Sequence, residues 1–395
     1  MKIGVDARLL SRPITGLGRY TWEMCRALSN IQDVTLYLYS PSSINNAVSG
    51  LESATIRTHS WNNGLLRQLW SESYLPLWAK EDEIDVFWGS SHRLPRFLSS
   101  RIARVVTIHD LVWKCAKETM HPATYFLEKI QMPVVVRKAD LIVADSYSTR
   151  DAVITEFDVK SQNISVIPLA ASNIQNIPSF DFLKKYDIDG PYFLFVGTLE
   201  PRKNLTRLLQ AYGSLPQSIK GKIKLVIVGG KGWGKVNLLD TVTQLDLTKR
   251  VKVLGRVDDM ALAMLHANAQ FLAIPSLYEG FGLPLVEAMS YGTPVLTANN
   301  SSMPEVAGNA GLLVDALDVE SIADGMKEMI TNNELRERLA KNAKSNASRF
   351  SWDESAKKLI TVFEKAIDLR KDKLASRFFI FIRLTCPIQL AVLSK

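Results

Sequence analysis

AIPSLYEGFGLPLVEAMSYGTPV, residues Ala273–Val295, joins a short apolar run to a helical pattern through a glycine-rich turn. The apolar run ends at Ile274 and indicates a buried strand, whereas Pro284 and Gly292 are typical of a helix start and a helix end. A glycine loop that feeds a helix N-terminus aims backbone N–H groups outward, where they attract anions. The stretch therefore predicts a strand–turn–helix unit with a ligand site at the carboxyl end of the strand.

Two carboxylates bracket this turn. Glu279 lies in the loop and Glu287 about one turn into the helix, so both side chains can face one cleft. Carboxylates at such a place are suited to accept hydrogen bonds from sugar hydroxyls. The alternative is a tight strand–helix connection with two surface acids, and the loop alone does not separate these two interpretations.

Strands and helices alternate along the whole chain. In the first half, apolar runs predict strands at 2–7, 34–39, 85–88, 104–108, 141–144 and 164–167, with helices at 16–29, 65–78, 119–138 and 148–157. After a stretch rich in Pro, Asn and Ser, strands are expected at 192–196, 223–228, 251–254, 270–274 and 294–298. The expected helices of this half are 205–215, 236–245, 258–266, 284–292, two within 318–348, and 352–369.

This alternation predicts an α/β fold of two doubly wound, Rossmann-like domains that face a central cleft. The expected first domain is 1–172, followed by a linker at 173–190. The second domain is 191–350, and 351–395 forms a last helix with a basic and aromatic tail.

Composition limits the class of partner. The 395 residues are 47% hydrophobic, which is enough for two separate cores. A net charge of +8 favours an anionic partner: nucleic acid, a phosphorylated substrate or a membrane surface. No nucleic-acid-binding motif is present, so nucleic acid is not expected.

The cysteines and the ends of the chain favour a cytoplasmic protein. Cys25, Cys115 and Cys386 are far apart and form no CxxC pair, so neither a disulfide framework nor a zinc site is expected. Residues 1–5 enter a strand pattern without the apolar segment of a signal peptide. No run reaches the about 20 apolar residues of a spanning helix; the nearest, 378–393, contains Arg383 and Pro387.

A basic pair follows the expected strand at 192–196, in the sequence VGTLEPRKN. Arg202 and Lys203 lie beside a helix N-terminus, where the helix dipole disfavours positive charge unless an anion is bound. A phosphate fits, because Arg can bind two of its oxygens and Lys supplies a point charge. The alternative is a pair of solvated basic side chains.

Two further candidates lie in the first half. Gly16-Leu17-Gly18 resembles a dinucleotide fingerprint, but Thr21 occupies the place of the third glycine and the second strand ends without an acid. Gly18 is better suited to close approach of the backbone to a diphosphate or sugar, with a structural turn as the alternative. His109 and Asp110 follow the strand at 104–108 and are expected to project into the cleft; a purely structural histidine stays open.

Two motifs carry less weight. The glycine-rich stretch 229–235 lacks the P-loop spacing and is either a ligand-side loop or a flexible turn. Asp187-Ile188-Asp189 has the form of a metal motif but precedes a strand, so it is expected to face away from the cleft as a solvated linker. No metal site is predicted.

From Gly16-Leu17-Gly18 to the last helix, the chain resembles the retaining glycosyltransferases of family 4, also called glycosyl transferases group 1, which have the GT-B fold. The most specific match is Glu279 with Glu287 eight positions later, in the EGFGLPLVEA block. IGVDARLL…TGLGRY and FVGTLEPRKNL are most similar to the mannosyltransferase B-like branch, whose members build bacterial O-antigen and capsular polysaccharides, often from GDP-mannose.

The resemblance implies a role for each matching residue. Glu287 would hold the ribose, Glu279 the donor sugar, and Arg202 with Lys203 the diphosphate. Gly18 would approach the diphosphate from the other domain, and His109 would lie over the sugar. The implied catalytic residues are His109, Glu279, Arg202 and Lys203. The implied donor-binding residues are Gly16, Gly18, Gly197, Arg202, Lys203, Arg256, Glu279, Gly280, Phe281, Gly282, Leu283 and Glu287.

The resemblance also implies a mechanism and partners. The donor is a nucleotide sugar, GDP-mannose or a UDP-sugar, and the acceptor is a lipid-linked oligosaccharide. No cofactor or metal is implied, because fixed cations stabilise the departing diphosphate. Many relatives have Gly-Arg where this chain has Gly197-Thr198, so one phosphate contact is in question. In the GT-B fold the last helix returns toward the first domain.

Peripheral membrane contact is a separate expectation. The 65–78 segment is aromatic and amphipathic, and Arg93, Arg96, Arg101 and Arg104 follow it. The tail from Lys371 to Arg383 combines basic and aromatic residues. Such faces suit an anionic membrane surface. The alternatives are core packing for the first segment and docking of the tail on the first domain.

Two other functions remain compatible with the sequence. A sugar-nucleotide 2-epimerase of the GT-B fold would use the same nucleotide site without an acceptor. A non-catalytic protein that binds sugar nucleotides is the second. The complete set of Arg202, Lys203, Glu279, Glu287 and His109 favours a transferase over both.

Overall fold

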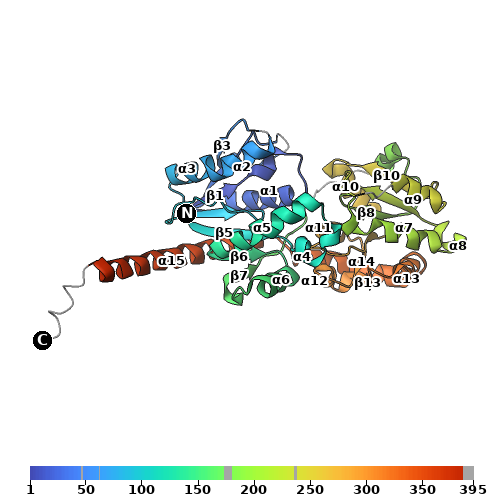
Figure 1. Ribbon diagram of the computed structural model, residues 1–395. Coiled ribbons are helices and arrows are strands. Elements are labelled where there is room, and N and C mark those ends of the chain that lie inside the picture. The colour runs from blue at the N-terminus through green and yellow to red at the C-terminus, as the bar shows by residue number, and fades with distance from the viewer. Residues whose placement is uncertain (46–47, 62, 173–179, 235–237, 386–395) are drawn as a thin grey trace.

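The computed structural model describes residues 1–45, 48–61, 63–172, 180–234 and 238–385. Part of the expected linker, 173–179, and the end of the expected tail, 386–395, lie outside the described residues. Figure 1 shows two lobes, each with a sheet and its own helices, and a long last helix that emerges from the first lobe and projects beyond it.

The first sheet is parallel, with the spatial order β3-β2-β1-β4-β5-β6-β7. Its strands are β1 (Lys2–Asp6), β2 (Thr35–Ser40), β3 (Thr55–Thr58), β4 (Val86–Gly89), β5 (Ala103–Ile108), β6 (Leu141–Ala144) and β7 (Ile164–Val166). Central strands such as β4 and β6 are buried along their whole length, because helices cover both faces. β3 was not expected from the sequence: TIRT is an exposed, largely polar edge strand without an apolar run.

Helices of this lobe are α1 (Gly16–Ser29), α2 (Gly64–Glu72), α3 (Tyr74–Glu81), α4 (Val112–Cys115), α5 (Pro122–Lys138) and α6 (Tyr147–Phe157). The single helix expected at 65–78 is wrong, since the chain breaks at Ser73. Pro76 has no N–H to bond the carbonyl of Glu72, which favours the break there. Trp70 and Leu75 are buried, which supports core packing for part of this segment, while Leu69 and Leu77 are about half exposed; membrane contact stays a prediction.

The second sheet is also parallel, with the order β10-β9-β8-β11-β12-β13. Its strands are β8 (Tyr192–Val196), β9 (Lys224–Val228), β10 (Val251–Gly255), β11 (Leu272–Ile274), β12 (Val295–Ala298) and β13 (Gly311–Val314). Its helices are α7 (Leu205–Ser214), α8 (Gln217–Lys220), α9 (Leu238–Gln244), α10 (Asp259–Asn268), α11 (Leu283–Ser290), α12 (Met303–Ala307), α13 (Val319–Thr331) and α14 (Asn333–Ala347).

Each sheet has one place where the strand order reverses, which we call its switch point. In the first sheet this lies between β1 and β4, and in the second between β8 and β11. Connections leave such a pair of strands toward opposite sides, so a crevice opens outside their carboxyl ends, where ligands of doubly wound proteins bind. The fold therefore offers two candidate crevices.

The last helix, α15 (Trp352–Thr385), extends beyond the expected end at 369 and packs against α1 and β5 of the first lobe. Phe363 lies 6.2 Å from Trp88 between ring centroids, and Lys373 Nζ binds Asp140 Oδ1 at 2.9 Å. Ser355 Oγ donates to the carbonyl of Pro168 at 2.7 Å, so the two places where the chain crosses between the lobes lie together.

The helix thus docks on the first lobe as the return of a GT-B chain requires. The side chains after Ser376 lie outside the described part of the structure, so the tail's expected aromatic and basic face stays a prediction. Within the described residues, none of the helices has the length and apolar character needed to span a bilayer.

Candidate active site

The loops after β8 and β11 meet at the switch point of the second sheet. The first loop turns through a short 3-10 helix, Pro201–Lys203, and Asn204 adopts a left-handed conformation with a φ of 60°. Asn204 Nδ2 then donates to the carbonyl of Pro275 at 2.9 Å, which ties the two loops together. Arg202 and Lys203 are thereby held against Glu279.

Glu279 is buried, and both its oxygens are bonded. Lys203 Nζ donates to Oε1 at 2.6 Å and Ser276 Oγ donates to the same oxygen at 2.7 Å. Arg202 Nη1 donates to Oε2 at 2.6 Å, and its Nη2 donates to Glu200 Oε1 at 2.6 Å. We call Glu200, Arg202, Lys203 and Glu279 the charged cluster.

The two cations of the charged cluster balance the charge of its two carboxylates. Burial alone would raise the pKa of Glu279, but Arg202, Lys203 and the hydroxyl of Ser276 lower it to about 2. Glu279 is therefore ionised at neutral pH. Lys203 can donate three hydrogen bonds and Arg202 five, so both keep donors for an added anion.

Gly280 brings this loop against the first lobe. A Cβ at Gly280 would lie 1.8 Å from the carbonyl oxygen of His109, so only glycine fits. The carbonyl of Gly280 accepts hydrogen bonds from Ser146 Oγ at 2.6 Å and from Thr149 Oγ1 at 3.1 Å. The structure therefore holds the two lobes in contact at the predicted site.

The remaining residues of the glycine turn lead into the start of α11. Gly282 has a φ of 97°, a left-handed conformation that favours glycine, and precedes Leu283. Phe281 is buried against Phe350, and its carbonyl accepts from Ser302 Oγ at 2.9 Å. The predicted donor contacts of these residues remain predictions.

Glu287 faces a second hollow between the lobes. Its Oε2 lies 3.9 Å from Nε2 of the buried His266, and Arg19 of α1 contributes an attractive charge. Burial raises the pKa of Glu287, and Arg19 opposes this rise. A cavity of about 270 Å³, open solvent included, is lined by Arg19, Ser172, Asp259 and Glu287 among others.

Gly16 and Gly18 lie at the start of α1, the helix that also carries Arg19. Among the described residues, a Cβ at Gly16 would meet no atom within 4 Å, and one at Gly18 would make only ordinary contacts beyond 3.5 Å. Packing within the protein therefore does not require glycine at these positions. Their place next to the Glu287 hollow is compatible with a ligand that approaches the backbone.

Gly197 and Arg256 lie at the same carboxyl edge of the second sheet. Gly197 contacts the stem of Lys203, and Arg256 Nε would lie 2.9 Å from a Cβ at Gly230. The 229–234 loop packs on the loop after β8, where the N–H of Leu199 donates to the carbonyl of Gly230 at 3.0 Å. The described part of this loop thus lies at the carboxyl edge of the sheet, and contact with a ligand stays a prediction.

His109 is buried, and both ring nitrogens are bonded within the protein. Nδ1 lies 2.6 Å from Asp145 Oδ2, and Nε2 lies 2.8 Å from the carbonyl of Ser90. Although burial favours the neutral ring, Asp145 and the Ser90 carbonyl raise the pKa of His109. The carbonyl of His109, and not its ring, thus meets the glycine loop.

The aspartates at 187 and 189 lie outside both hollows. Asp187 pairs with Lys252 at 2.8 Å and Asp189 with Lys224 at 2.5 Å, at the amino ends of β10 and β9. The prediction that they face away from the cleft is confirmed. In the part of the chain that the structure describes, no group of three or more His, Cys, Asp or Glu is placed to hold a metal ion.

Several site residues gave too weak a signal to be singled out from the sequence. Ser146 and Thr149 bond Gly280, and Asp145 bonds His109. All three follow β6, whose carboxyl end could have marked them as cleft residues. Glu305 accepts from the N–H of Tyr147 at 3.1 Å across the lobes, and nothing in its local sequence indicates this.

Comparison with known proteins agrees with this geometry. Residues 14–171 match the family described as Glycosyltransferase Family 4, and residues 180–346 match Glycosyl transferases group 1. O-antigen chain mannosyltransferase B of Escherichia coli is 31% identical over 383 residues, 92% of this chain and 100% of the relative. O-antigen chain mannosyltransferase RfbU of Salmonella typhimurium is 28% identical, over 57% of this chain and 60% of the relative.

Solved structures share the fold. Sucrose-phosphate synthase from Thermosynechococcus elongatus superposes with a TM-score of 0.74 at 18% identity, over 92% of this chain and 98% of that one. WaaG, a glycosyltransferase involved in lipopolysaccharide biosynthesis, gives 0.69 at 18% identity, over 93% and 99%. The predicted GT-B fold is confirmed. Family models match both lobes, and a relative is similar over its whole length. The chain therefore belongs to the family 4, group 1 glycosyltransferases.

Proposed function

We propose that this glycosyltransferase moves mannose from GDP-mannose to a lipid-linked acceptor, with retention of configuration, in O-antigen or related polysaccharide biosynthesis. The observation that carries the proposal is the charged cluster, which lies at the switch point of the second sheet and faces the first lobe through Gly280. The full-length similarity to an O-antigen chain mannosyltransferase supports the choice of sugar and pathway.

The charged cluster suits the charges of the reaction. Breaking the bond between sugar and phosphate leaves positive charge on the sugar ring and negative charge on the departing diphosphate. Glu279, held ionised by its partners, would stabilise the sugar, and the remaining donors of Arg202 and Lys203 would bind the diphosphate. These cations supply the charge that a metal ion provides in other transferases, so we propose a reaction without a cofactor.

Glu287 would hold the ribose in the second hollow. Its carboxylate can accept from two neighbouring hydroxyls, and Arg19, which follows Gly18 in α1, borders the same space. Arg256 would lie near the base. The structure of Anabaena HepE holds UDP and glucose, which supports a nucleotide sugar as donor here; guanine is proposed on the mannosyltransferase relatives.

The configuration at the sugar carbon would be retained if the acceptor attacks the same face of the sugar ring from which the diphosphate departs. The oxygens of Glu279 are both bonded to cationic donors, which makes this carboxylate a poor nucleophile. The acceptor hydroxyl would attack the sugar carbon, and the departing phosphate would take its proton. The backbone carbonyl of His109 would hold the glycine loop in place at Gly280. A covalent sugar trapped on an enzyme side chain would contradict this step.

A donor screen tests the proposal. The purified protein is incubated with GDP-mannose, UDP-glucose or UDP-N-acetylglucosamine, with and without a lipid-linked saccharide, and with a metal chelator as a further arm. We expect transfer from GDP-mannose that resists chelation, and an NMR coupling constant that shows retention. Epimerisation without an acceptor would support the 2-epimerase, and binding without turnover would support the non-catalytic alternative.

Location is proposed together with function. A lipid-linked acceptor places the enzyme at the inner face of the cytoplasmic membrane, as a peripheral protein. The half-exposed Leu69 and Leu77 support contact with such a surface. Co-sedimentation with anionic vesicles, compared with neutral ones, measures this contact.

A further inference from the structure

The loop after β4 folds back toward the end of β5 at His92. The two strands pair in register as far as Gly89 and Val106. A Cβ at Gly89 would lie 1.9 Å from the carbonyl oxygen of Arg93, so the chain turns back tightly after the strand. His92 lies in this turn with a φ of 52°, a left-handed conformation that is uncommon for residues other than glycine. Strained residues of this kind cluster at functional sites.

The ring of His92 takes the place of a backbone acceptor. The N–H of His92 donates to the carbonyl of Thr107 at 3.0 Å, which extends the pairing of the two strands. In a regular parallel ladder, the next bond would run from the N–H of His109 to the carbonyl of His92. Instead, the N–H of His109 donates to Nε2 of His92 at 2.7 Å. A side chain therefore fixes the backbone at His109 where the ladder ends.

This bond determines which ring nitrogen of His92 carries the proton. Nε2 must offer its lone pair, so a neutral ring has its proton on Nδ1. Nδ1 lies 3.6 Å from Oε2 of Glu128 on α5, and the two side chains are only 12% and 18% exposed. Burial alone would raise the pKa of Glu128, but His92 and Arg93 lower it, so Glu128 is ionised at neutral pH. An ionised carboxylate on this side favours the proton on Nδ1 and leaves Nε2 free to accept.

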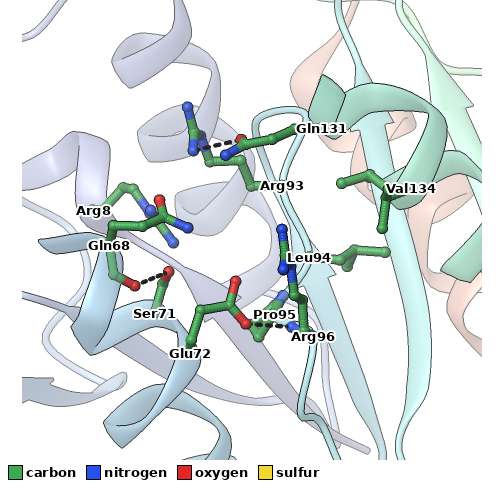
Figure 2. Close-up of a pocket in the computed structure, with 11 residues that line it drawn as sticks. Arg8, Gln68, Ser71, Glu72, Arg93, Leu94, Pro95, Arg96, Gln131 and Val134 are labelled. Carbon is green, nitrogen blue, oxygen red and sulfur yellow. Dashed lines mark hydrogen bonds between the residues drawn. The ribbon is translucent and has the colours of Figure 1, made fainter. Parts of the chain in front are cut away.

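Helix α5 anchors the same loop at a second point. Arg93, the residue after His92, donates to Oε1 of Gln131 at 3.0 Å, a bond that Figure 2 shows. Glu128 and Gln131 are three positions apart and therefore lie on one face of α5. Two consecutive side chains of the loop thus contact one helix face, which limits the movement of the His92 ring.

The carbonyl of His109 meets the second lobe. It accepts from Thr149 Oγ1 at 3.2 Å, and it lies where a Cβ on Gly280 would approach to 1.8 Å. Gly280 directly follows Glu279 of the charged cluster. Because the N–H and the carbonyl belong to one residue, a shift of the N–H away from His92 would also move the carbonyl against the glycine loop. The ring of His92 therefore bears on the contact that places the charged cluster.

We propose that His92, supported by Glu128, is a positioning residue for sugar transfer: its Nε2 holds the backbone of His109 where the glycine loop of the second lobe closes on it. In this role His92 acts through His109 and not by contact with a substrate. The inference goes beyond the proposed function and does not depend on which sugar is moved. Loss of the bond should misplace the glycine loop and slow transfer, with little effect on nucleotide binding by the second lobe.

Selective ¹⁵N labelling of histidine tests the bond without any turnover. The chain has five histidines, so their ring and amide signals can be assigned by substituting each in turn. At about pH 8, where imidazole in water is neutral, we expect His92 to carry its proton on Nδ1. The amide proton of His109 should lie downfield and move upfield in His92→Leu. A His92 ring with its proton on Nε2 would overturn the proposal.

Turnover of substituted proteins tests the positioning role. His92→Leu, which removes the acceptor, should lower kcat about tenfold to a hundredfold and keep GDP affinity within about twofold. His92→Gln should recover most of the rate, because a glutamine oxygen can accept from the N–H of His109. His59→Leu is the matched control: the His59 ring also accepts a backbone N–H, from Ser60 at 2.8 Å, but it follows the edge strand β3. This control should keep the full rate.

The outcomes separate this inference from the proposed function. Full turnover of His92→Leu would overturn the inference, and so would an equal loss in His92→Gln, which would show that the ring shape matters and not the acceptor. If no donor is turned over, the proposed function is refuted, and the ring and amide signals still decide whether His92 holds His109. Thermal unfolding checks that each variant folds. If His92→Leu does not, the tautomer of the unaltered protein and the rate of His92→Gln decide.

Discussion

Glu279 keeps its charge in a buried position because three side chains donate to it. Since its pKa falls from 4.5 to about 2, this group stabilises the fold above about pH 4.5, and that stability is lost as the pH falls toward 2. Glu279→Gln should therefore reduce the loss of stability between about pH 5 and about pH 3 by about 2 kcal/mol. Urea unfolding between about pH 5 and about pH 3 measures the difference.

The matched control is Glu320→Gln, an exposed glutamate in the first turn of α13. It should keep the acid dependence of the unaltered protein. If Glu279→Gln kept that dependence too, the bonds drawn to this carboxylate would not exist in solution.

Glu287 is expected to respond to pH in the opposite sense. Burial raises its pKa, and Arg19 only opposes this, so the carboxylate gains a proton at a higher pH than usual. Nucleotide affinity should therefore weaken as the pH falls through this raised pKa. Glu287→Gln should bind GDP about tenfold to a hundredfold more weakly at neutral pH and lose the pH dependence. Calorimetric titration with GDP at several pH values measures the affinity and its pH dependence. If the affinity of Glu287→Gln for GDP changed with pH as that of the unaltered protein does, Glu287 would not be the ribose-binding group.

At the scale of one loop, Gly280 sets how closely the lobes approach. Gly280→Ala places a Cβ 1.8 Å from the His109 carbonyl, so the lobes must separate and the bonds from Ser146 and Thr149 break. We expect turnover to fall about a hundredfold, because a shift of this size misplaces donor and acceptor. GDP affinity should change by less than about twofold.

Gly64→Ala is the control, since among the described residues a Cβ at Gly64 would meet no atom within 4 Å. Steady-state kinetics of the two variants should separate them clearly. Equal rates would show that this contact does not limit catalysis.

Elements differ in how far the sequence predicts them. β6 was predicted with its exact bounds because LIVA is a buried apolar run between polar neighbours. β3 escaped prediction because it lies at a sheet edge, where polar residues are tolerated and pairing with the neighbouring strand decides. β13 escaped prediction for another reason: GLLV has only three consecutive apolar residues, and periodicity does not identify so short a run. Arg202, Lys203 and Glu279 were each predicted to follow the carboxyl end of a strand, but their mutual pairing joins residues 76 and 77 positions apart, which only the fold brings close.

On the scale of the whole molecule, Glu305 holds the lobes together at a second point. Its carboxylate accepts from the N–H groups of Tyr147 and Ser148 at the start of α6, at 3.1 and 3.4 Å. Glu305→Ala should favour separated lobes, so the radius of gyration of the ligand-free protein should rise in X-ray scattering. Glu337→Ala, exposed on α14, should leave it unchanged. An unaltered radius for both would show that this contact is dispensable.

Contacts between the lobes were beyond sequence reasoning. Gly280 and Thr149 are 131 positions apart, and neither carries a local pattern that points to the other. Their meeting follows from how two separately stable sheets are set against each other, which depends on many weak contacts spread over both surfaces.

The bond from Ser355 to Pro168 has a mechanical consequence. This hydrogen bond joins the two segments that connect the lobes. We therefore expect the lobes to rotate about this point and not to slide past each other. A small rotation about this point would produce larger displacements in the parts of the lobes that lie farther from it. We therefore expect product release to need only a small rotation of one lobe against the other at this bond.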